Sequence, residues 1–308
     1  MEQKIIDISE EAAGLSVRNS QLVIQTSDRE FSAPLEEIAG LVVSHPGAHY
    51  THATLAGVCA NGGTVVLCNE KRLPIGMLLP LAQNYVQTER MASQLTVTVP
   101  RKKQLWRQIV VAKVRAQGRL LELLHGDDHG LARLARTVKS GDTSNVEAQA
   151  ARRYWPVLID PAFRRIPGRR DFTNSALNYG YAVLRGIIAR AVCAVGLHPS
   201  LGLHHHNRYN PFSLIDDVME PYRPLVDHTV CLLDKTCPQS MEMDRDVKAA
   251  LIRPLMNRRH EINGESRSLF DIAARTATSL FKAFGNPNGR LQYPELTFED
   301  DTEEEDEE

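Results

Sequence analysis

The hydrophobic period of this chain changes near residue 82, and that change constrains the fold more than any other feature. Before it, apolar residues form short alternating or β-branched runs that are typical of strands, at 15–17, 22–24, 39–43 and 64–68. After it, apolar residues recur at helical spacing, at 105, 109, 112, 116, 120 and 123. We therefore predict an α+β, two-domain fold: a small N-terminal β-rich domain over residues 1–82 and a larger all-α domain over residues 83–296.

Local signals add detail to this division. Thr51 is a helix-capping residue and Gly62 a stop, so one short helix is predicted between the strands. Pro74, Gly76 and Pro80 predict a linker between the domains. Three further helices are predicted in the second domain, at 176–195, 247–256 and 268–284.

Charge is distributed very unevenly along the chain. The whole sequence holds 36 basic and 38 acidic residues, a net charge of −2. Residues 1–85 hold five basic and nine acidic residues (−4), whereas residues 101–190 hold eighteen basic and seven acidic (+11). Residues 299–308 read EDDTEEEDEE and contain nine acids. The overall value is thus a cancellation, and the basic middle favours a polyanionic partner.

The end of the chain predicts a disordered tail, and the apolar runs and the start of the chain indicate its cellular compartment. Residues 297–308 are expected to form an acidic disordered tail, because they lack the apolar residues that a packed segment needs. The longest apolar runs fall far short of the ~20 residues of a membrane span. The acidic start MEQKIIDISEE lacks the apolar core of a signal peptide. We expect a cytoplasmic protein with no membrane partner.

The densest candidate site is the segment GLHHHNRYNPFSLIDDVMEPYRP at 202–224. Ser213 and Asp216 match a capping box, which would give Asp216 a structural role. Asp217 and Glu220 lie three residues apart and share a helix face. One histidine from the preceding run could join them, and that donor set suits Mg²⁺ or Mn²⁺ better than Zn²⁺. A solvated acidic helix start is the alternative.

Glu147 is a second acidic candidate, on a predicted helix of its own. It lies three residues after Ser144, so the pair also matches a capping box, and spacing alone favours that structural role. Its surroundings are strongly basic and aromatic. Guanidinium groups bind phosphates bidentately and aromatic rings stack on bases, so this stretch predicts nucleic-acid binding. The candidate contacts are Arg152, Arg153, Tyr154, Arg164, Arg165, Arg169 and Arg170.

Several common chemistries lack their motifs in this sequence. There is no GxxxxGK[ST] or GxGxxG phosphate loop, no serine or cysteine nucleophile signature, and no HExxH zinc motif. Nucleotide-driven chemistry, acyl transfer and zinc-dependent hydrolysis are therefore poor interpretations.

Taken in order, these blocks resemble a known family. The sequence resembles the universal CRISPR-associated adaptation integrase, the first of the two core spacer-acquisition proteins, in the version that accompanies type II systems. The resemblance covers nearly the whole chain except the acidic tail. Its most informative segments are LWRQIVVAKVRAQGRLL, NVEAQAARRYWP, DFTNSALNYGYAVLRGIIARAVCAVGLHPSLGLHH and NPFSLIDDVMEPYRPLVD.

The resemblance implies a metal site and a reaction. The ligands of the family are a Glu, a His and an acid, which fall on Glu147, His205 and Glu220 here, with Asp217 as a secondary acid. The ligand histidine follows a glycine by three residues, here Gly202, which selects His205 over His204 and His206, although a slip of one residue stays open. The implied activity is Mg²⁺- or Mn²⁺-dependent DNA cleavage and strand transfer.

The resemblance also implies partners. These are double-stranded DNA with free 3′ ends, CRISPR repeat DNA, a second copy of the chain joined through the β-domains, and a small second adaptation protein that completes a heterohexamer in a prokaryotic cytoplasm. The RNA-guided effector nuclease of the same system is a further candidate partner. Two other interpretations stay open: a stand-alone metal-dependent DNA repair nuclease and a noncatalytic DNA-binding scaffold.

Overall fold

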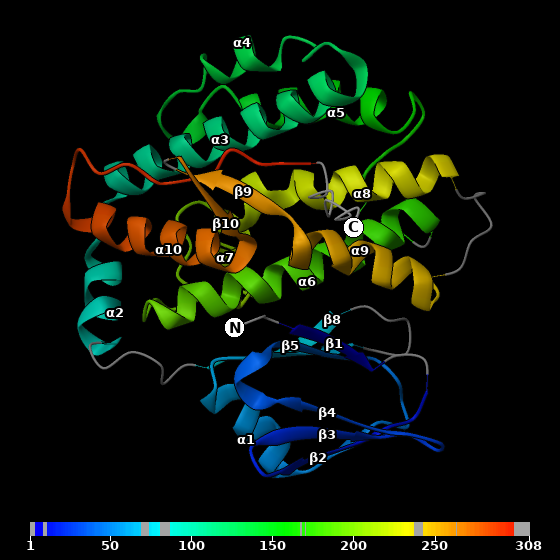
Figure 1. The fold of residues 1–308 in the computed structure, drawn as a ribbon. Coiled ribbons are helices and arrows are strands. Elements are labelled where there is room, and N and C mark those ends of the chain that lie inside the picture. The colour runs from blue at the N-terminus through cyan, green and yellow to red at the C-terminus, as the bar shows by residue number, and fades with distance from the viewer. Residues whose placement is uncertain are drawn as a thin grey trace, which may run out of the picture.

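The computed structural model describes residues 4–8, 11–68, 74–80, 87–166, 168–169, 171–236, 243–262 and 264–298. It has a smaller part built of strands and a larger part built of helices (Figure 1). This is the α+β division that the change of hydrophobic period predicts. The predicted domain boundary at 82 and the acidic segment 299–308 lie outside the described residues.

The N-terminal part consists of two four-stranded sheets. The first has the order β1-β5-β7-β8, in which β1 (Lys4–Ile8), β5 (Ile38–Val43) and β7 (Thr64–Cys68) are parallel and β8 (Pro74–Leu78) is antiparallel to β7. The second has the order β4-β3-β2-β6, made of β4 (Glu30–Pro34), β3 (Gln21–Gln25), β2 (Gly14–Arg18) and β6 (His49–Tyr50). A short 3₁₀ turn, η1 (Leu35–Glu37), and helix α1 (His52–Ala60) complete this part.

Local chemistry accounts for these elements. The β2–β3 hairpin turns at Asn19 and Ser20, both with positive φ, which matches the right-handed twist of the strands. Helix α1 begins as predicted, because the Thr51 hydroxyl accepts a hydrogen bond from the Thr54 amide at 3.3 Å. The predicted linker at 74–80 is wrong in part: residues 74–78 form strand β8 at a sheet edge, where a leading proline is tolerated.

The C-terminal part is a helical assembly with one small hairpin. The hairpin, β9 (Arg259–Ile262) with β10 (Glu265–Ser268), is the exception to the predicted all-α character. The helices are α2 (Gln87–Thr96), α3 (Val99–His125), α4 (Leu131–Ala135), α5 (Val146–Leu158), α6 (Phe172–Ala194), α7 (Ser213–Met219), α8 (Arg223–Thr236), α9 (Arg245–Asn257) and α10 (Leu269–Gly285), with 3₁₀ turns η2 (Ser140–Asp142) and η3 (Glu220–Tyr222).

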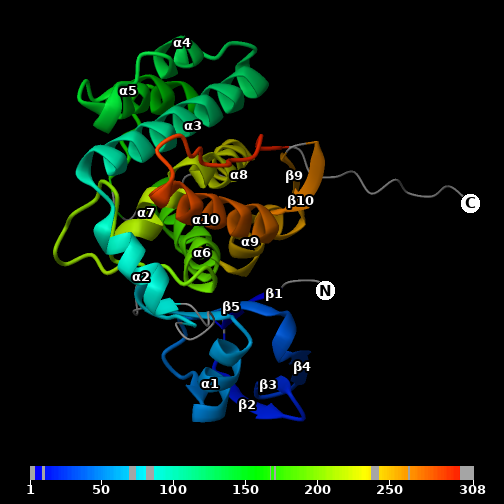
Figure 2. The ribbon, with the colours of Figure 1, turned by 90° about the vertical axis from the view of Figure 1, so that its left-hand side faces the viewer.

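Helix α6 is the central element of the molecule. It lies between the first sheet and most helices of the C-terminal part (Figures 1 and 2) and contacts α7, α8, α9, α10, β5 and β7. Val42 and Val66 of the sheet belong to the same buried apolar cluster as the helices. At Gly180 a Cβ atom would lie 2.4 Å from Val226 of α8, so glycine is required for this close approach.

Helix α3, with 27 residues, is the longest helix in the described ranges and lies below α4 in Figure 1. Thr98 caps its start and Gly126, with φ of +73°, ends it. The packed chain continues to Phe298, which is buried against His228, so the first two residues of the predicted tail belong to the helical part. In the described ranges, no helix combines the length and the apolar character that crossing a membrane requires.

Candidate metal-dependent DNA site

Asp217 organises the histidine loop. Its carboxylate is fully buried and accepts hydrogen bonds from the backbone amides of Leu203 at 2.6 Å, His204 at 3.0 Å and His205 at 3.3 Å. It also lies 2.6 Å from Nδ1 of His205. At Gly202 a Cβ atom would lie 2.5 Å from the His205 carbonyl oxygen, so a side chain there would displace the loop. Asp217 therefore fixes the position and the ring orientation of His205.

The other two predicted ligands converge on a lysine. Nζ of Lys113, on α3, lies 2.6 Å from Oε1 of Glu147 and 2.5 Å from Oε2 of Glu220. The second oxygen of Glu220 accepts a hydrogen bond from Nε of Arg223 at 2.9 Å. Three separate elements, α3, α5 and η3, thus bring the two carboxylates around one ammonium group. Neither Lys113 nor Arg223 was among the predicted site residues.

Neighbouring charges shift the pKa values of Glu220 and His205. Burial acts to raise the pKa of Glu220, but the Arg223 and Lys113 charges outweigh it and lower that pKa to about 2. The hydrogen bond to Asp217 is the largest cause that raises the pKa of His205, and the Asp217, Glu220 and Glu147 charges add to it against desolvation. Both glutamates therefore lie near enough to His205 to act on its charge.

The three neighbouring histidines have different surroundings. The His204 ring stacks on Trp106 with centroids 4.3 Å apart and planes 1° apart, and desolvation is the largest cause that lowers its pKa. His206 is exposed. Nδ1 of His205 is bound by Asp217, which leaves Nε2 as the ring nitrogen available to bind a metal ion. Geometry therefore favours His205, the register that the glycine spacing selects.

The donor set fits a hard divalent cation. Across the described ranges, no three His, Cys, Asp or Glu side chains already form a metal-binding group, and the Lys113 ammonium lies between the two glutamates. Apart from its ion pair with that ammonium, the buried Oε2 of Glu220 has no hydrogen-bond partner among these residues. An oxygen of this kind, a second carboxylate and one imidazole nitrogen match the preferences of Mg²⁺ or Mn²⁺.

Both predicted capping boxes are wrong. The amides of Val146 and Glu147 are capped by the carboxylate of Asp142, at 2.8 Å and 3.0 Å, so the Glu147 side chain is free to reach Lys113. Helix α7 starts at Ser213 without a side-chain cap. Asp216 instead accepts hydrogen bonds from Arg185 and Asn210.

The predicted DNA contacts divide into two groups. Arg152, Arg153 and Arg164 are exposed, and Arg169 is exposed beside Asp171 at 3.0 Å, whereas Arg170 lies outside the described residues. Tyr154 is completely buried and donates to Asp227 at 2.8 Å, so it cannot contact DNA in this structure. Arg165 is half-buried, and its guanidinium donates to Asn174 and Asn178, which gives it a structural role.

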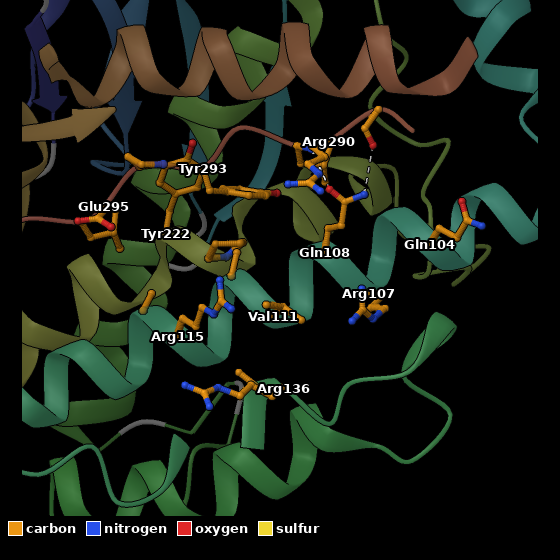
Figure 3. A pocket seen from close by; sticks show the side chains of 18 of the residues that line it. Gln104, Arg107, Gln108, Val111, Arg115, Arg136, Tyr222, Arg290, Tyr293 and Glu295 are labelled. Atoms are coloured by element: carbon orange, nitrogen blue, oxygen red, sulfur yellow. Dashed lines mark hydrogen bonds between the residues drawn. The ribbon is translucent and has the colours of Figure 1, made fainter. Parts of the chain in front are cut away.

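A groove on the side of α3 opposite Lys113 carries basic residues that are not among the predicted DNA contacts. We call it the arginine groove; it has a volume of about 1110 Å³ and lies between α3, the residues after α4 and the segment 287–296 (Figure 3). Its exposed arginines are Arg107, Arg115, Arg119, Arg136 and Arg290. The basic residues within 105–123 can be recognised in the sequence. That the segment 287–296 forms the opposite wall can be seen only in the folded structure.

Comparisons with known proteins identify the family of the chain. Residues 6–236 match the family model described as CRISPR associated protein Cas1. The chain is 37% identical over 287 residues to a CRISPR-associated endonuclease Cas1 from Neisseria meningitidis serogroup C, covering 92% of this chain and 93% of that protein.

Solved structures share the fold at lower sequence identity. A casposase bound to integration product superposes with a TM-score of 0.79 at 18% identity, covering 96% of this chain and 95% of that chain. A Cas6-RT-Cas1–Cas2 complex superposes with a TM-score of 0.74 at 17% identity, covering 96% of this chain and 36% of that chain. With the matched region and the Neisseria relative both spanning most of its length, the chain belongs to the Cas1 family of CRISPR-associated proteins.

Proposed function

We propose that this chain is a metal-dependent DNA endonuclease and strand-transfer integrase of CRISPR adaptation, which inserts captured DNA fragments into the CRISPR array as new spacers. One observation carries the proposal: Glu147 and Glu220 converge on a single cationic position, beside a histidine that Asp217 holds in place. The endonuclease name of the Neisseria relative supports the chemistry, and that relative makes a type II system the favoured context.

In the proposed reaction, the 3′-hydroxyl of a captured fragment attacks a phosphodiester at the edge of a repeat. A phosphorus–oxygen bond forms to that hydroxyl, the bond to the departing 3′-oxygen of the repeat strand breaks, and the hydroxyl proton passes to solvent or a nearby base. Cleavage is the same displacement with water as the attacking group. A bound Mg²⁺ or Mn²⁺ would neutralise charge on the phosphate and favour deprotonation of the attacking oxygen.

Residues of this chain would have separate roles in that reaction. Glu147, Glu220 and Nε2 of His205 would hold the cation, and Asp217 would orient His205, since its contacts already engage the loop amides and Nδ1. Arg223 would keep Glu220 ionised through its hydrogen bond and charge. Arg152 and Arg153, exposed further along α5 than Glu147, would bind the DNA backbone without reading sequence.

The proposed partners follow from the same assignment. These are double-stranded DNA with free 3′ ends, repeat DNA, a second copy of this chain, and a small second adaptation protein that completes a heterohexamer. One structural relative is a Cas6-RT-Cas1–Cas2 complex, which supports a second adaptation protein as a partner. The effector nuclease of the system is a further proposed partner.

The test is a strand-transfer and nicking assay with Mg²⁺, Mn²⁺ or EDTA. Glu147→Gln, His205→Ala and Glu220→Gln should each lower activity by about two orders of magnitude or more, because each removes a group that stabilises transition-state charge. Glu122→Gln, an exposed glutamate on α3, is the matched control and should retain activity. Full activity in any of the three variants would remove that residue from the site.

The same assay separates the alternatives. A noncatalytic scaffold would bind DNA but give no metal-dependent product, and a stand-alone repair nuclease would reach full activity without the second adaptation protein. Product formation in EDTA would contradict the proposed metal dependence.

A further inference from the structure

The arginine groove adjoins the proposed catalytic site, because Pro221 and Tyr222, which follow Glu220, also line it, but it uses another face of α3. Gln104, Gln108, Val111 and Arg115 line it and follow one another every three or four residues along α3, so they share one face of the helix. Lys113 lies two residues before Arg115, which places it ~200° around the helix axis. Helix α3 therefore presents Lys113 to one side and the groove to the other.

Three of the exposed arginines of the groove have no counter-charge among the described residues. The guanidinium groups of Arg115, Arg136 and Arg290 make no hydrogen bond or ion pair with any residue that the structure describes, although Arg107 donates to the Val138 carbonyl at 2.7 Å. Figure 3 shows Arg115 on α3 and Arg136 just beyond α4. Because so many like charges along one groove repel one another, an anionic occupant would stabilise them.

One carboxylate of the chain already lies in the groove. Glu295 lines it and pairs with Arg119 at 3.2 Å. The segment that carries Glu295 forms one wall and is fixed in place: Arg101 donates to the carbonyls of Pro287 at 2.9 Å and Gly289 at 2.9 Å. The groove thus accepts the carboxylate of a polypeptide that runs alongside α3.

The chain itself supplies an anion of the required kind close by. The acidic segment 299–308 holds nine carboxylates and begins four residues after Glu295. Ten residues reach at most ~35 Å when extended. The groove arginines on α3 run from 107 to 119, about 18 Å at the rise of an α-helix. The acidic segment is therefore long enough to span the groove.

We propose that the arginine groove is a docking surface for an acidic polypeptide segment, and that residues 299–308 of the same chain are its occupant. The docking is electrostatic: Asp and Glu carboxylates pair with the exposed guanidinium groups, which can hold a carboxylate bidentately. Because the segment is tethered a few residues away, its effective concentration at the groove is in the millimolar range. This proposal does not rest on the proposed DNA chemistry.

The experiment uses fluorescence anisotropy with a labelled peptide of sequence EDDTEEEDEE. The peptide should bind saturably to the chain lacking 299–308, and added salt should weaken the binding. The triple substitution Arg115→Gln, Arg136→Gln and Arg290→Gln should weaken it by about tenfold or more, given three ion pairs of ordinary surface strength. Arg133→Gln is the matched control, because Arg133 is exposed on α4 but does not line the groove.

The full-length chain should bind the same peptide more weakly than the truncated chain, because its own segment competes for the groove. Equal affinity of the two chains would overturn the proposal, as would unchanged binding by the triple variant. A second measurement determines the affinity of each variant for a duplex oligonucleotide. If the triple variant loses duplex affinity while the peptide does not bind the truncated chain, the groove is a DNA surface and the proposal is wrong. Thermal unfolding of each variant verifies that it is folded.

Discussion

Lys113 is the residue on which the two glutamates of the site converge, and its role can be tested apart from activity. Its ammonium occupies the position between Glu147 and Glu220 that the proposed cation needs. Lys113→Met should lower the free energy of unfolding in EDTA by about 2 kcal/mol, because two carboxylates then lose a largely buried counter-charge. Saturating Mn²⁺ should stabilise the variant more than the parent protein, since no ammonium competes with it.

Denaturant unfolding with EDTA and with Mn²⁺ measures both effects. Lys103→Met, at an exposed position on the same helix, is the control and should behave like the parent protein in both conditions. A Mn²⁺-dependent gain in Lys113→Met no larger than that of the parent would show that Lys113 does not compete with the cation.

The sequence could have indicated Lys113 but not its partners. Lys113 follows Ile109 by four residues and Val110 by three, so it lies toward the apolar side of α3, where a lysine needs a counter-charge. Which acid supplies that charge depends on how α3, α5 and η3 cross, and no local pattern encodes the crossing. The same reason explains why Tyr154 was wrongly predicted to contact DNA. Its neighbours in sequence are basic, but the orientation of α5 places its ring in the core, beside Asp227.

At the scale of elements, a buried polar network joins α5, α6 and α8. Asp227 of α8 accepts hydrogen bonds from Tyr154 of α5 and Tyr181 of α6, and burial raises its pKa to about 6. Because the folded pKa lies above the unfolded one, the folded state holds this proton more tightly. The Asp227 contribution therefore favours folding below about pH 4 and is lost as the pH rises through 6.

Asp227→Asn should remove that pH dependence. The free energy of unfolding of the parent, relative to the variant, should fall by about 2 kcal/mol between pH 4 and pH 7. Urea unfolding of both proteins at the two pH values gives this difference. An equal change with pH in parent and variant would exclude Asp227 as its source.

Periodicity predicted the long elements well and the short polar ones badly. Helices α3, α6, α9 and α10 lie where apolar residues recur at helical spacing, because each packs one stripe or more into the core. Strand β8 was interpreted as a linker from its Pro and Gly, which a sheet edge tolerates. The hairpin β9–β10 consists largely of polar residues, so its sequence lacks the apolar alternation that predicts a strand. Its strands are recognised only from their pairing in the folded structure.

At the scale of the whole molecule, charge separation predicts how DNA affinity depends on salt. The strand-built part carries the acidic front of the sequence, and the exposed Arg152 and Arg153 lie on α5 within the basic stretch 101–190. Each phosphate contact contributes about 0.9 to the slope of log K against log salt concentration. Arg152→Gln with Arg153→Gln should therefore reduce that slope by about two and weaken binding to unrelated sequences equally.

Titration of a duplex over a series of NaCl concentrations gives the slope. Arg29→Gln is the control, because Arg29 is exposed on the acidic N-terminal part and should leave the slope unchanged. Arg165→Gln should act differently again: its guanidinium binds Asn174 and Asn178, so the substitution should lower the free energy of unfolding by about 1–2 kcal/mol while the slope stays the same. A slope that Arg152 and Arg153 do not affect would place the DNA backbone on another face of the molecule.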